Sequence, residues 1–192
     1  GVDGNILKNG WYDLNGKLYY FYPGGNSPRN SFFNLEDKRY YVDEMGARKN
    51  PGWFSIDNVN SKGISYTTWY YVTEDGFLLR DGWHELEGVT CYFDTNGSAY
   101  RNRWFNLNDD RYYVDENGNR QNGWFSVTST NANGQEYTNW YRADSNGVLW
   151  RNGWRESDGN WYFFDANGLN YRKRWYTDES GNRYYLDENG IL

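Results

Sequence analysis

The sequence predicts an all-β protein, a β-solenoid of about eight stacked β-hairpins. Three observations lead to this fold class: aromatic residues recur at regular spacing, polar turn motifs follow them at a fixed distance, and no segment shows helical periodicity. Stacking is required because a single two-stranded hairpin cannot bury its apolar face in water.

An aromatic residue opens each unit, and these residues mark the repeat. The markers are Trp11, Phe33, Trp53, Trp83, Trp104, Trp124, Trp154 and Trp175. Successive markers lie 20–22 or 30 residues apart in the order short, short, long, which gives a larger period of 71 or 72 residues. Trp69 accordingly recurs as Trp140, and Arg39 recurs as Arg111. A period of this size is typical of stacked supersecondary units.

Residues 104–122 show how one unit is built. A short aromatic run from Trp104 leads to a polar turn, and a second run ends at Asp115. Two short runs joined by a tight turn predict a β-hairpin. In the Asp-x-x-Gly motif that follows, we expect Gly118 to take a positive φ and Asp115 to bond the backbone ahead of it.

The alternation of side chains along each second strand predicts which face is buried. Counting back from the turn, positions one and three are expected in the core. They are Phe21, Val42, Val72, Phe93, Val114, Ala143, Phe164 and Leu186, with Tyr19, Tyr40, Tyr70, Cys91, Tyr112, Tyr141, Tyr162 and Tyr184. Positions two and four form a second face that mixes aromatic residues with arginine, and we interpret it as a pocket wall.

Composition narrows the class of protein. Leu, Ile, Val and Phe together make up under a fifth of the chain, and the net charge is -6, which would favour disorder if 11 Trp and 20 Tyr were not present. The acidic balance argues against nucleic acid as a partner, since no basic patch occurs. No apolar run approaches the roughly 18 residues of a membrane span, so membrane insertion is not expected.

The repeats predict one elongated domain over residues 1–192, with super-repeats at about 10–81, 82–152 and 153–192. Residues 1–5 resemble the tail of an earlier repeat. We therefore expect the chain to be a fragment of a larger protein.

Nothing in the sequence predicts catalysis, a metal site or a cofactor. The carboxylates are plentiful but sit in repeated turns, whereas a catalytic pair should be unique and set in a cleft. No nucleophile elbow, phosphate loop or zinc motif occurs. Cys91 is the only cysteine and His84 the only histidine, so we interpret them as a small apolar residue and an exposed residue.

One motif resembles a known family. Gly153-Trp154, followed by the Gly-x-Trp-Tyr-Phe-Phe-Asp-x-x-Gly segment from Gly159 to Gly168, is similar to the cell-wall-binding repeat. That repeat occurs in choline-binding proteins of Gram-positive bacteria and their phages, in glucan-binding domains of glucansucrases and in the repetitive domains of clostridial toxins. The resemblance implies a hairpin solenoid with ligands between successive hairpins, and a secreted or cell-surface location.

The resemblance leaves two main ligand classes open. In choline-binding members an aromatic cage holds a quaternary ammonium, often closed by a Met or Leu two residues after the turn glycine, a place that Leu78 and Leu149 hold here. In glycan-binding members sugar rings stack on aromatic faces, and the long repeats at 53–82 and 124–153 resemble toxin repeats that mark oligosaccharide sites. A protein-binding adhesin or spacer is a third possibility.

We favour a non-catalytic carbohydrate-binding module for α-glucan, cell-wall or host oligosaccharides, with choline-bearing teichoic acid as the alternative. The aromatic pairs of the long repeats and the arginines at a fixed phase of the period supply ring faces and fork-shaped donors. The predicted ligand-binding residues are Trp53, Trp69, Tyr71, Trp83, Trp124, Trp140, Trp154, Trp161, Trp175, Arg39 and Arg111.

Overall fold

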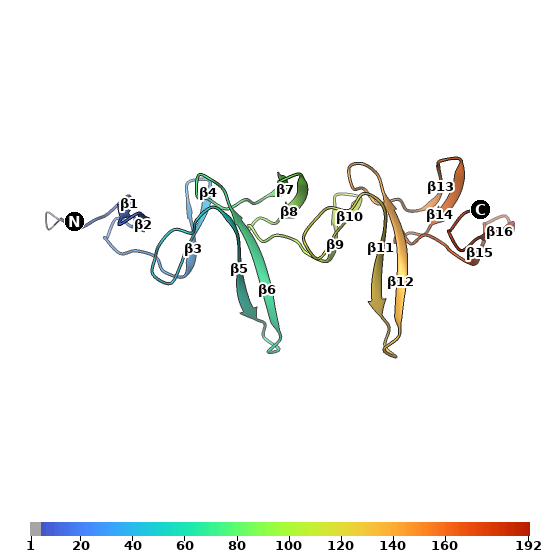
Figure 1. The fold of residues 1–192 in the computed structure, drawn as a ribbon, viewed down its shortest axis with the longest axis horizontal. Helices are drawn as coiled ribbons and strands as arrows, with labels where there is room; N and C mark the ends of the chain where they lie inside the picture. Colours follow the sequence, from blue (N-terminus) through green and yellow to red (C-terminus); the bar gives the residue numbers. More distant parts are fainter. Residues whose placement is uncertain (1–4) are drawn as a thin grey trace. The chain divides into compact units, whose positions relative to one another are not determined.

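The computed structural model describes residues 5–192, so four of the five residues in the predicted N-terminal tail lie outside it. The described residues form sixteen strands, each paired with its chain neighbour in an antiparallel two-stranded sheet (Figure 1). No helix long and apolar enough to cross a membrane occurs in this part of the chain. The predicted all-β class and the series of eight hairpins are confirmed.

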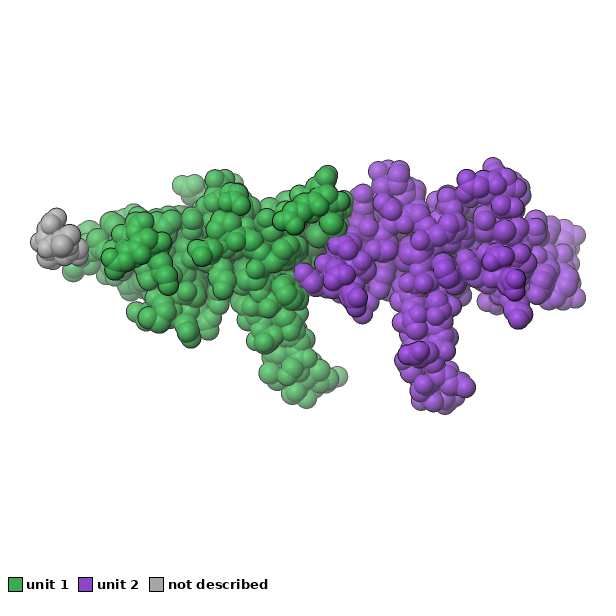
Figure 2. Space-filling view, viewed as in Figure 1, with its two compact units in different colours: residues 1–100 green, residues 101–192 purple. Residues whose placement is uncertain are grey.

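The chain divides into two compact units at residues 100 and 101 (Figure 2). Unit 1 contains β1 (Gly10–Leu14), β2 (Lys17–Phe21), β3 (Ser31–Leu35), β4 (Lys38–Val42), β5 (Gly52–Val59), β6 (Ser65–Val72), β7 (Gly82–Leu86) and β8 (Val89–Phe93). Unit 2 contains β9 (Arg103–Leu107), β10 (Asp110–Val114), β11 (Gly123–Thr130), β12 (Glu136–Ala143), β13 (Gly153–Ser157), β14 (Asn160–Phe164), β15 (Arg174–Thr177) and β16 (Arg183–Leu186). The prediction of one domain over 1–192 stays a prediction.

The turns are built as their sequences indicate. At the tip of β1–β2, Asn15 and Gly16 have φ values of 58° and 78°, the two positive values of a type I′ turn, whose twist matches the strands. After six of the eight second strands, one carboxylate oxygen of the turn aspartate accepts two backbone N–H bonds. For Asp115 the donors are Asn117 and Asn119, both at 2.9 Å. The same pair of bonds recurs at Asp43, Asp94, Asp144, Asp165 and Asp187.

The predicted core face is largely confirmed. Position one before the turn is buried in seven of its eight members, with Val42, Phe93 and Leu186 fully inaccessible, while Phe21 at the start of the chain is half-buried. Position three is more uneven: Tyr40, Tyr70, Cys91 and Tyr162 are buried, and the other four are half-buried. Burial of large rings in this way supplies the apolar area that the aliphatic residues do not.

Consecutive hairpins of a unit meet in what we call a joint, and each joint is held by one repeated hydrogen bond. The residue two after the turn glycine donates its N–H to the carbonyl at position four of the preceding hairpin. The six pairs, at 2.8–3.0 Å, are Arg48 to Leu18, Leu78 to Arg39, Ala99 to Trp69, Leu149 to Arg111, Asn170 to Trp140 and Leu192 to Trp161.

The turn glycine is needed for close approach as well as for its φ. A Cβ on Gly168, at φ +84°, would lie 2.3 Å from Leu149 Cδ2 of the preceding hairpin. Leu78 and Leu149, the residues that the family resemblance places at the mouth of a cage, are therefore buried in the joints instead.

The structure corrects two sequence interpretations. In β3–β4 the residue equivalent to the opening tryptophans is Phe32, paired with Tyr41, and not Phe33, which pairs with Tyr40. The second face is also not simply a pocket wall. Its rings at Tyr20 and Tyr113 are buried because the core face of the next hairpin packs on them.

β5–β6 and β11–β12 are the two long hairpins, each with eight residue pairs in register. Figure 1 shows each of them extending past the shorter hairpins of its own unit. Their inner halves lie in the joints, and their outer halves carry the exposed polar loops that the 30-residue spacing indicated.

Candidate ligand-binding site

In unit 1 the predicted residues of the long hairpin lie on its second face. Trp53 is 38% exposed, pairs with Tyr71 in register and meets its ring edge-on at 5.3 Å between centroids. Trp53 also stacks on Phe93 of the next hairpin at 5.7 Å. Trp69 lies on the same face, one pair further out, and Trp83 lies on β7 against Tyr92. The set therefore spans one joint of unit 1, with Trp53 at its exposed edge.

In unit 2 the equivalent pair, Trp124 and Trp140, shares one cation. The guanidinium carbon of Arg172 lies 4.2 Å from the centroid of the Trp140 ring and 5.5 Å from that of Trp124. Arg142 lies over the Trp124 ring as well, at 5.3 Å. This is cation–π geometry, and the protein supplies the cation itself.

Arg172 is held in place by a buried amide. Its Nε donates to Asn170 Oδ1 at 2.9 Å, and Asn170, only 3% exposed, donates its own Nδ2 to the Phe163 carbonyl at 3.3 Å. Burial lowers the pKa of the Arg172 guanidinium, while Tyr162 and Asp187 act in the opposite direction. An arginine keeps its charge at neutral pH, so the pocket holds a positioned cation.

Trp154 belongs to the following joint. Its ring contacts Phe163 on its own hairpin and Tyr176 and Tyr184 on β15–β16, with centroid distances of 5.3, 5.8 and 5.3 Å. The contacts of Trp154 therefore lie between β13–β14 and β15–β16, one joint beyond the Trp124–Trp140 pair with which the sequence grouped it.

The most exposed predicted indoles are Trp161 and Trp175, at 50% and 53%. Arg183 lies over the Trp175 ring at 4.6 Å, which places a forked donor beside an open ring. Of the predicted residues, these two have the ring exposure that stacking of a sugar requires.

Arg39 and Arg111 lie over rings of their own hairpins. The guanidinium carbons are 5.0 Å from the Phe32 ring and 5.2 Å from the Trp104 ring. Among the described residues, neither Nε atom has a hydrogen-bond partner although both are buried, and Arg39 Nη1 donates to Asn34 at 3.3 Å. Both arginines cover aromatic faces of their own hairpins.

Sequence reasoning missed Arg172, which lies four residues after the turn glycine Gly168. Arg80 and Arg151 hold the same position in other joints, and each donates to a carbonyl at the tip of the preceding hairpin, Asp37 and Asp109 respectively. The recurrence of arginine at this position was the available signal in the sequence.

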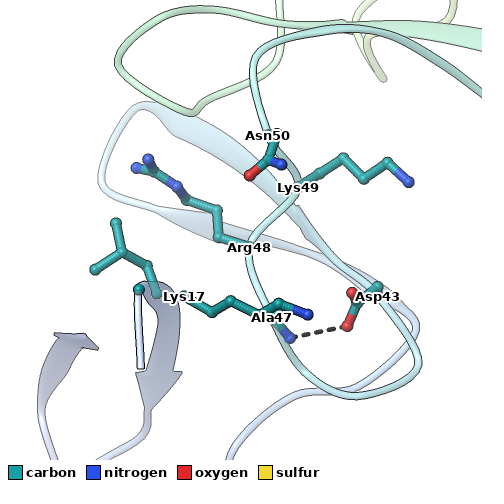
Figure 3. A pocket seen from close by; sticks show the side chains of 8 residues that line it. Lys17, Asp43, Ala47, Arg48, Lys49 and Asn50 are labelled. Atoms are coloured by element: carbon teal, nitrogen blue, oxygen red, sulfur yellow. Dashed lines mark hydrogen bonds between the residues drawn. The ribbon is translucent and has the colours of Figure 1, made fainter. Parts of the chain in front are cut away.

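The joint between β1–β2 and β3–β4 has asparagine at this position. Here a cavity of about 340 Å³ is lined by Gly16, Lys17, Leu18, Asp43, Ala47, Arg48, Lys49 and Asn50. Figure 3 shows the short Asn50 side chain at its rim, with the Arg48 guanidinium and the Lys49 amine directed away from each other. The Arg48 guanidinium donates instead to the Asp75 carbonyl at 2.9 Å.

The remaining titratable groups show structural roles. One carboxylate oxygen of each turn aspartate accepts backbone N–H bonds. No cluster of three or more His, Cys, Asp or Glu side chains suited to a metal occurs in residues 5–192. Cys91 is buried, as interpreted from the sequence. His84 is half-buried rather than exposed, with Nε2 2.8 Å from the Arg80 carbonyl oxygen.

Comparisons with known proteins support the family resemblance. Residues 102–119, 152–169 and 173–192 match the family described as "Putative cell wall binding repeat". No curated protein sequence matches the chain. All three matches lie in the second unit, and one of them includes residues 153–168, so the resemblance drawn from that segment is confirmed.

The chain is similar to three solved structures. The choline-binding domain of CbpL from Streptococcus pneumoniae is 21% identical with a TM-score of 0.52, over 95% of each chain. The modular autolysin LytC from Streptococcus pneumoniae is 18% identical with a TM-score of 0.47, over 95% of this chain and 41% of that one. Alternansucrase in complex with isomaltononaose is 24% identical with a TM-score of 0.35, over 100% of this chain and 15% of that one. The chain thus spans 41% of the autolysin's length, and the CbpL domain confirms the hairpin-repeat fold.

Proposed function

We propose that the chain is a non-catalytic carbohydrate-binding module, which attaches a secreted or surface protein of a Gram-positive bacterium or its phage to a glycan. The observation that carries this proposal is the contrast between its indoles. Trp161 and Trp175 present half-exposed rings, whereas the ring pair best suited to an ammonium ion, Trp124 and Trp140, already faces the Arg172 guanidinium.

Half-exposed indoles with arginine forks beside them suit sugars. A pyranose can lay its apolar face on the ring while a guanidinium donates to its hydroxyl groups. Trp175 in unit 2 has this character, with Arg183 adjacent, and Trp161 and Trp53 offer rings that are 50% and 38% exposed. We propose Trp69, Tyr71 and Trp83 as flanking groups of the Trp53 site, and Arg39 and Arg111 as hydrogen-bond donors on their own hairpins.

Repetition compensates for weak single sites. Each exposed indole offers a small contact area, so the affinity of one site is low, and several sites on one glycan chain raise it through effective concentration. The cell wall binding repeats of the second unit are consistent with a polymeric target. The turn aspartates bond the backbone, which is the role that their repeated motif predicts.

Choline-bearing teichoic acid is the second candidate, and one observation favours it. Trp53 and Tyr71 meet edge-on at 5.3 Å, an arrangement of rings from which an ammonium cage is built.

Tryptophan fluorescence titration separates the two ligands. The chain is titrated with choline and, separately, with α-glucan and cell-wall oligosaccharides. A saturable response to an oligosaccharide, with none to millimolar choline, supports the proposal, and a response to choline alone would make the chain a teichoic-acid anchor.

Two variants locate the sugar site. Trp161→Ala and Trp175→Ala should weaken oligosaccharide binding with unchanged circular dichroism, because both side chains are about half exposed. Tyr137→Ala is the control, since Tyr137 is 46% exposed on the outer part of β12 and lies outside the proposed sites. If Tyr137→Ala lost as much oligosaccharide binding as the two tryptophan variants, the sugar site could not be assigned to Trp161 and Trp175.

A further inference from the structure

The fourth residue after the turn glycine lies at the contact between two consecutive hairpins. Arg80 and Arg151 each reach back to a carbonyl at the preceding hairpin tip. Asn50 is too short to do so, and its joint contains the cavity of about 340 Å³. The joint of Arg80 also contains a cavity, of about 190 Å³, so of these two joints the one with the short Asn50 side chain has the larger cavity.

Arg172 faces a tryptophan pair, and Arg101 holds the equivalent position one larger period earlier, where the preceding hairpin has Trp69. The hairpin preceding Arg172 has Trp140 at position four, where the hairpins facing Arg80 and Arg151 have Arg39 and Arg111. The Arg172 guanidinium accordingly lies over indole rings, at 4.2 Å from Trp140 and 5.5 Å from Trp124.

The position of Arg172 is built rather than accidental. Asn170 is buried, accepts from Arg172 Nε and donates to the Phe163 carbonyl, so its amide has one orientation. The Asn170 N–H also forms the joint hydrogen bond to the Trp140 carbonyl at 2.9 Å. Asn170 thus holds both the backbone of Trp140 and the guanidinium of Arg172 in place.

A quaternary ammonium group requires the volume and the ring faces that the guanidinium already uses. A bound quaternary ammonium ion would also be repelled by the positive charge of the Arg172 guanidinium, because the pocket that they would share is partly desolvated. We propose that Arg172 is a specificity-determining residue: a built-in cation that keeps quaternary ammonium ligands out of the Trp124–Trp140 pocket. This inference concerns the ligand that is excluded, so it does not depend on which sugar the chain binds.

The test is a choline titration followed by tryptophan fluorescence on the whole chain and five variants. Arg172→Ala and Arg172→Gln remove the cation, and Gln retains much of the side-chain length in case the alanine variant does not fold. We expect both to bind choline about tenfold or more tightly than the unchanged protein, as expected when a desolvated cation–π site is opened.

Arg151→Ala is the matched control. It removes an arginine from the same position of the preceding joint, where Arg111 and not a tryptophan lies at position four. It should leave the choline response unchanged. Folding of each variant is checked by circular dichroism, and adding Trp140→Ala to Arg172→Gln should abolish the gain.

The inference is overturned if a folded Arg172→Gln protein responds to choline no more than the unchanged chain. It is equally overturned if the unchanged chain binds choline and Trp140→Ala removes that binding. An oligosaccharide titration of the unchanged chain, run in parallel, tests the proposed function separately. Failure there with a choline gain in Arg172→Gln would reject the glycan proposal and retain this one.

Discussion

The two long hairpins share a backbone plan but differ in what faces their opening tryptophan. Both begin with Gly-Trp-Phe-Ser and have eight residue pairs. In β5–β6 the residue opposite Trp53 is Tyr71, whereas in β11–β12 the residue opposite Trp124 is Arg142. Both tryptophans pack on the phenylalanine of the next hairpin, Phe93 or Phe164, but Trp53 meets Tyr71 edge-on whereas Trp124 meets the Arg142 guanidinium at 5.3 Å.

The outer halves of these hairpins differ as well. Val59, Ile64 and Tyr66 are exposed at the tip of β5–β6, where β11–β12 has Thr130, Gln135 and Tyr137. The tip turn itself is the same: one side-chain oxygen of Asn60 or Asn131 accepts two backbone N–H bonds. The turn hydrogen bonds and the core rings are thus common to the two hairpins, and the exposed residues at their tips differ.

The shared core predicts the largest effect. Phe54 and Phe125 are 7% and 8% exposed, and each stacks on the tyrosine opposite, at 5.2 Å for Tyr70 and 5.6 Å for Tyr141. Phe54→Ala and Phe125→Ala should each lower the free energy of unfolding by about 3–5 kcal/mol, because both leave a cavity. Thermal denaturation measures this. A small loss in either variant would show that the two cores are not equivalent.

The turn glycines predict a somewhat smaller effect that separates strain from close approach. Gly134 and Gly147 have φ values of +78° and +79°, but only at Gly147 would a Cβ collide, at 2.6 Å from Arg120 Cδ. Gly134→Ala should cost about 1–2 kcal/mol for the left-handed backbone. Gly147→Ala should add about 1–3 kcal/mol for overpacking. Equal losses on chemical denaturation would mean that the Arg120 side chain moves aside freely.

The half-buried Tyr141 predicts a loss of stability in alkali. Burial is the main cause that raises the pKa of Tyr141 above 10.0. Folding therefore favours the neutral phenol, and this contribution is complete below the ordinary pKa and disappears as the pH rises through the higher folded value. Between about pH 8 and about pH 11, the melting temperature of Tyr141→Phe should fall less than that of the unchanged chain. Parallel losses in the two proteins would assign the alkaline effect to other groups.

Much of this fold could be predicted because its units are local. Each hairpin is closed by its own turn, and side-chain alternation places Val42 or Phe164 in the core without knowledge of any distant contact. The register of β3 was misjudged because Phe32 and Phe33 are both aromatic, and only the hairpin pairing distinguishes them.

The candidate site was less accessible to sequence reasoning because its contacts cross from one hairpin to the next. Arg172 is 32 residues from Trp140, and it leaves a connecting segment in which alternation assigns no face. The exposure of Trp161 and Trp175 depends equally on what the neighbouring hairpin covers. The binding roles of the predicted residues stay predictions for the titrations to decide.

The smallest expected effect comes from exchanging the residues that distinguish the two hairpins. Arg142 lies over Trp124 and, at 4.6 Å, over Trp150, but its buried Nε has no hydrogen-bond partner among the described residues. Arg142→Tyr loses cation–π contacts of about 0.5–2 kcal/mol, gains an edge-on ring pair of about 0.5–1.5 kcal/mol, and removes the unsatisfied donor.

Arg142→Tyr should therefore lie within about 1 kcal/mol of the unchanged chain, because the gains and losses nearly cancel. Arg142→Ala, which loses the contacts and gains no ring, should be clearly less stable in the same thermal denaturation series. If the tyrosine variant were as unstable as the alanine variant, the guanidinium would be a structural requirement of β11–β12. A tyrosine could then not replace the arginine at position 142. Tyr71 in β5–β6 and Arg142 in β11–β12 would therefore not be interchangeable opposite the opening tryptophan.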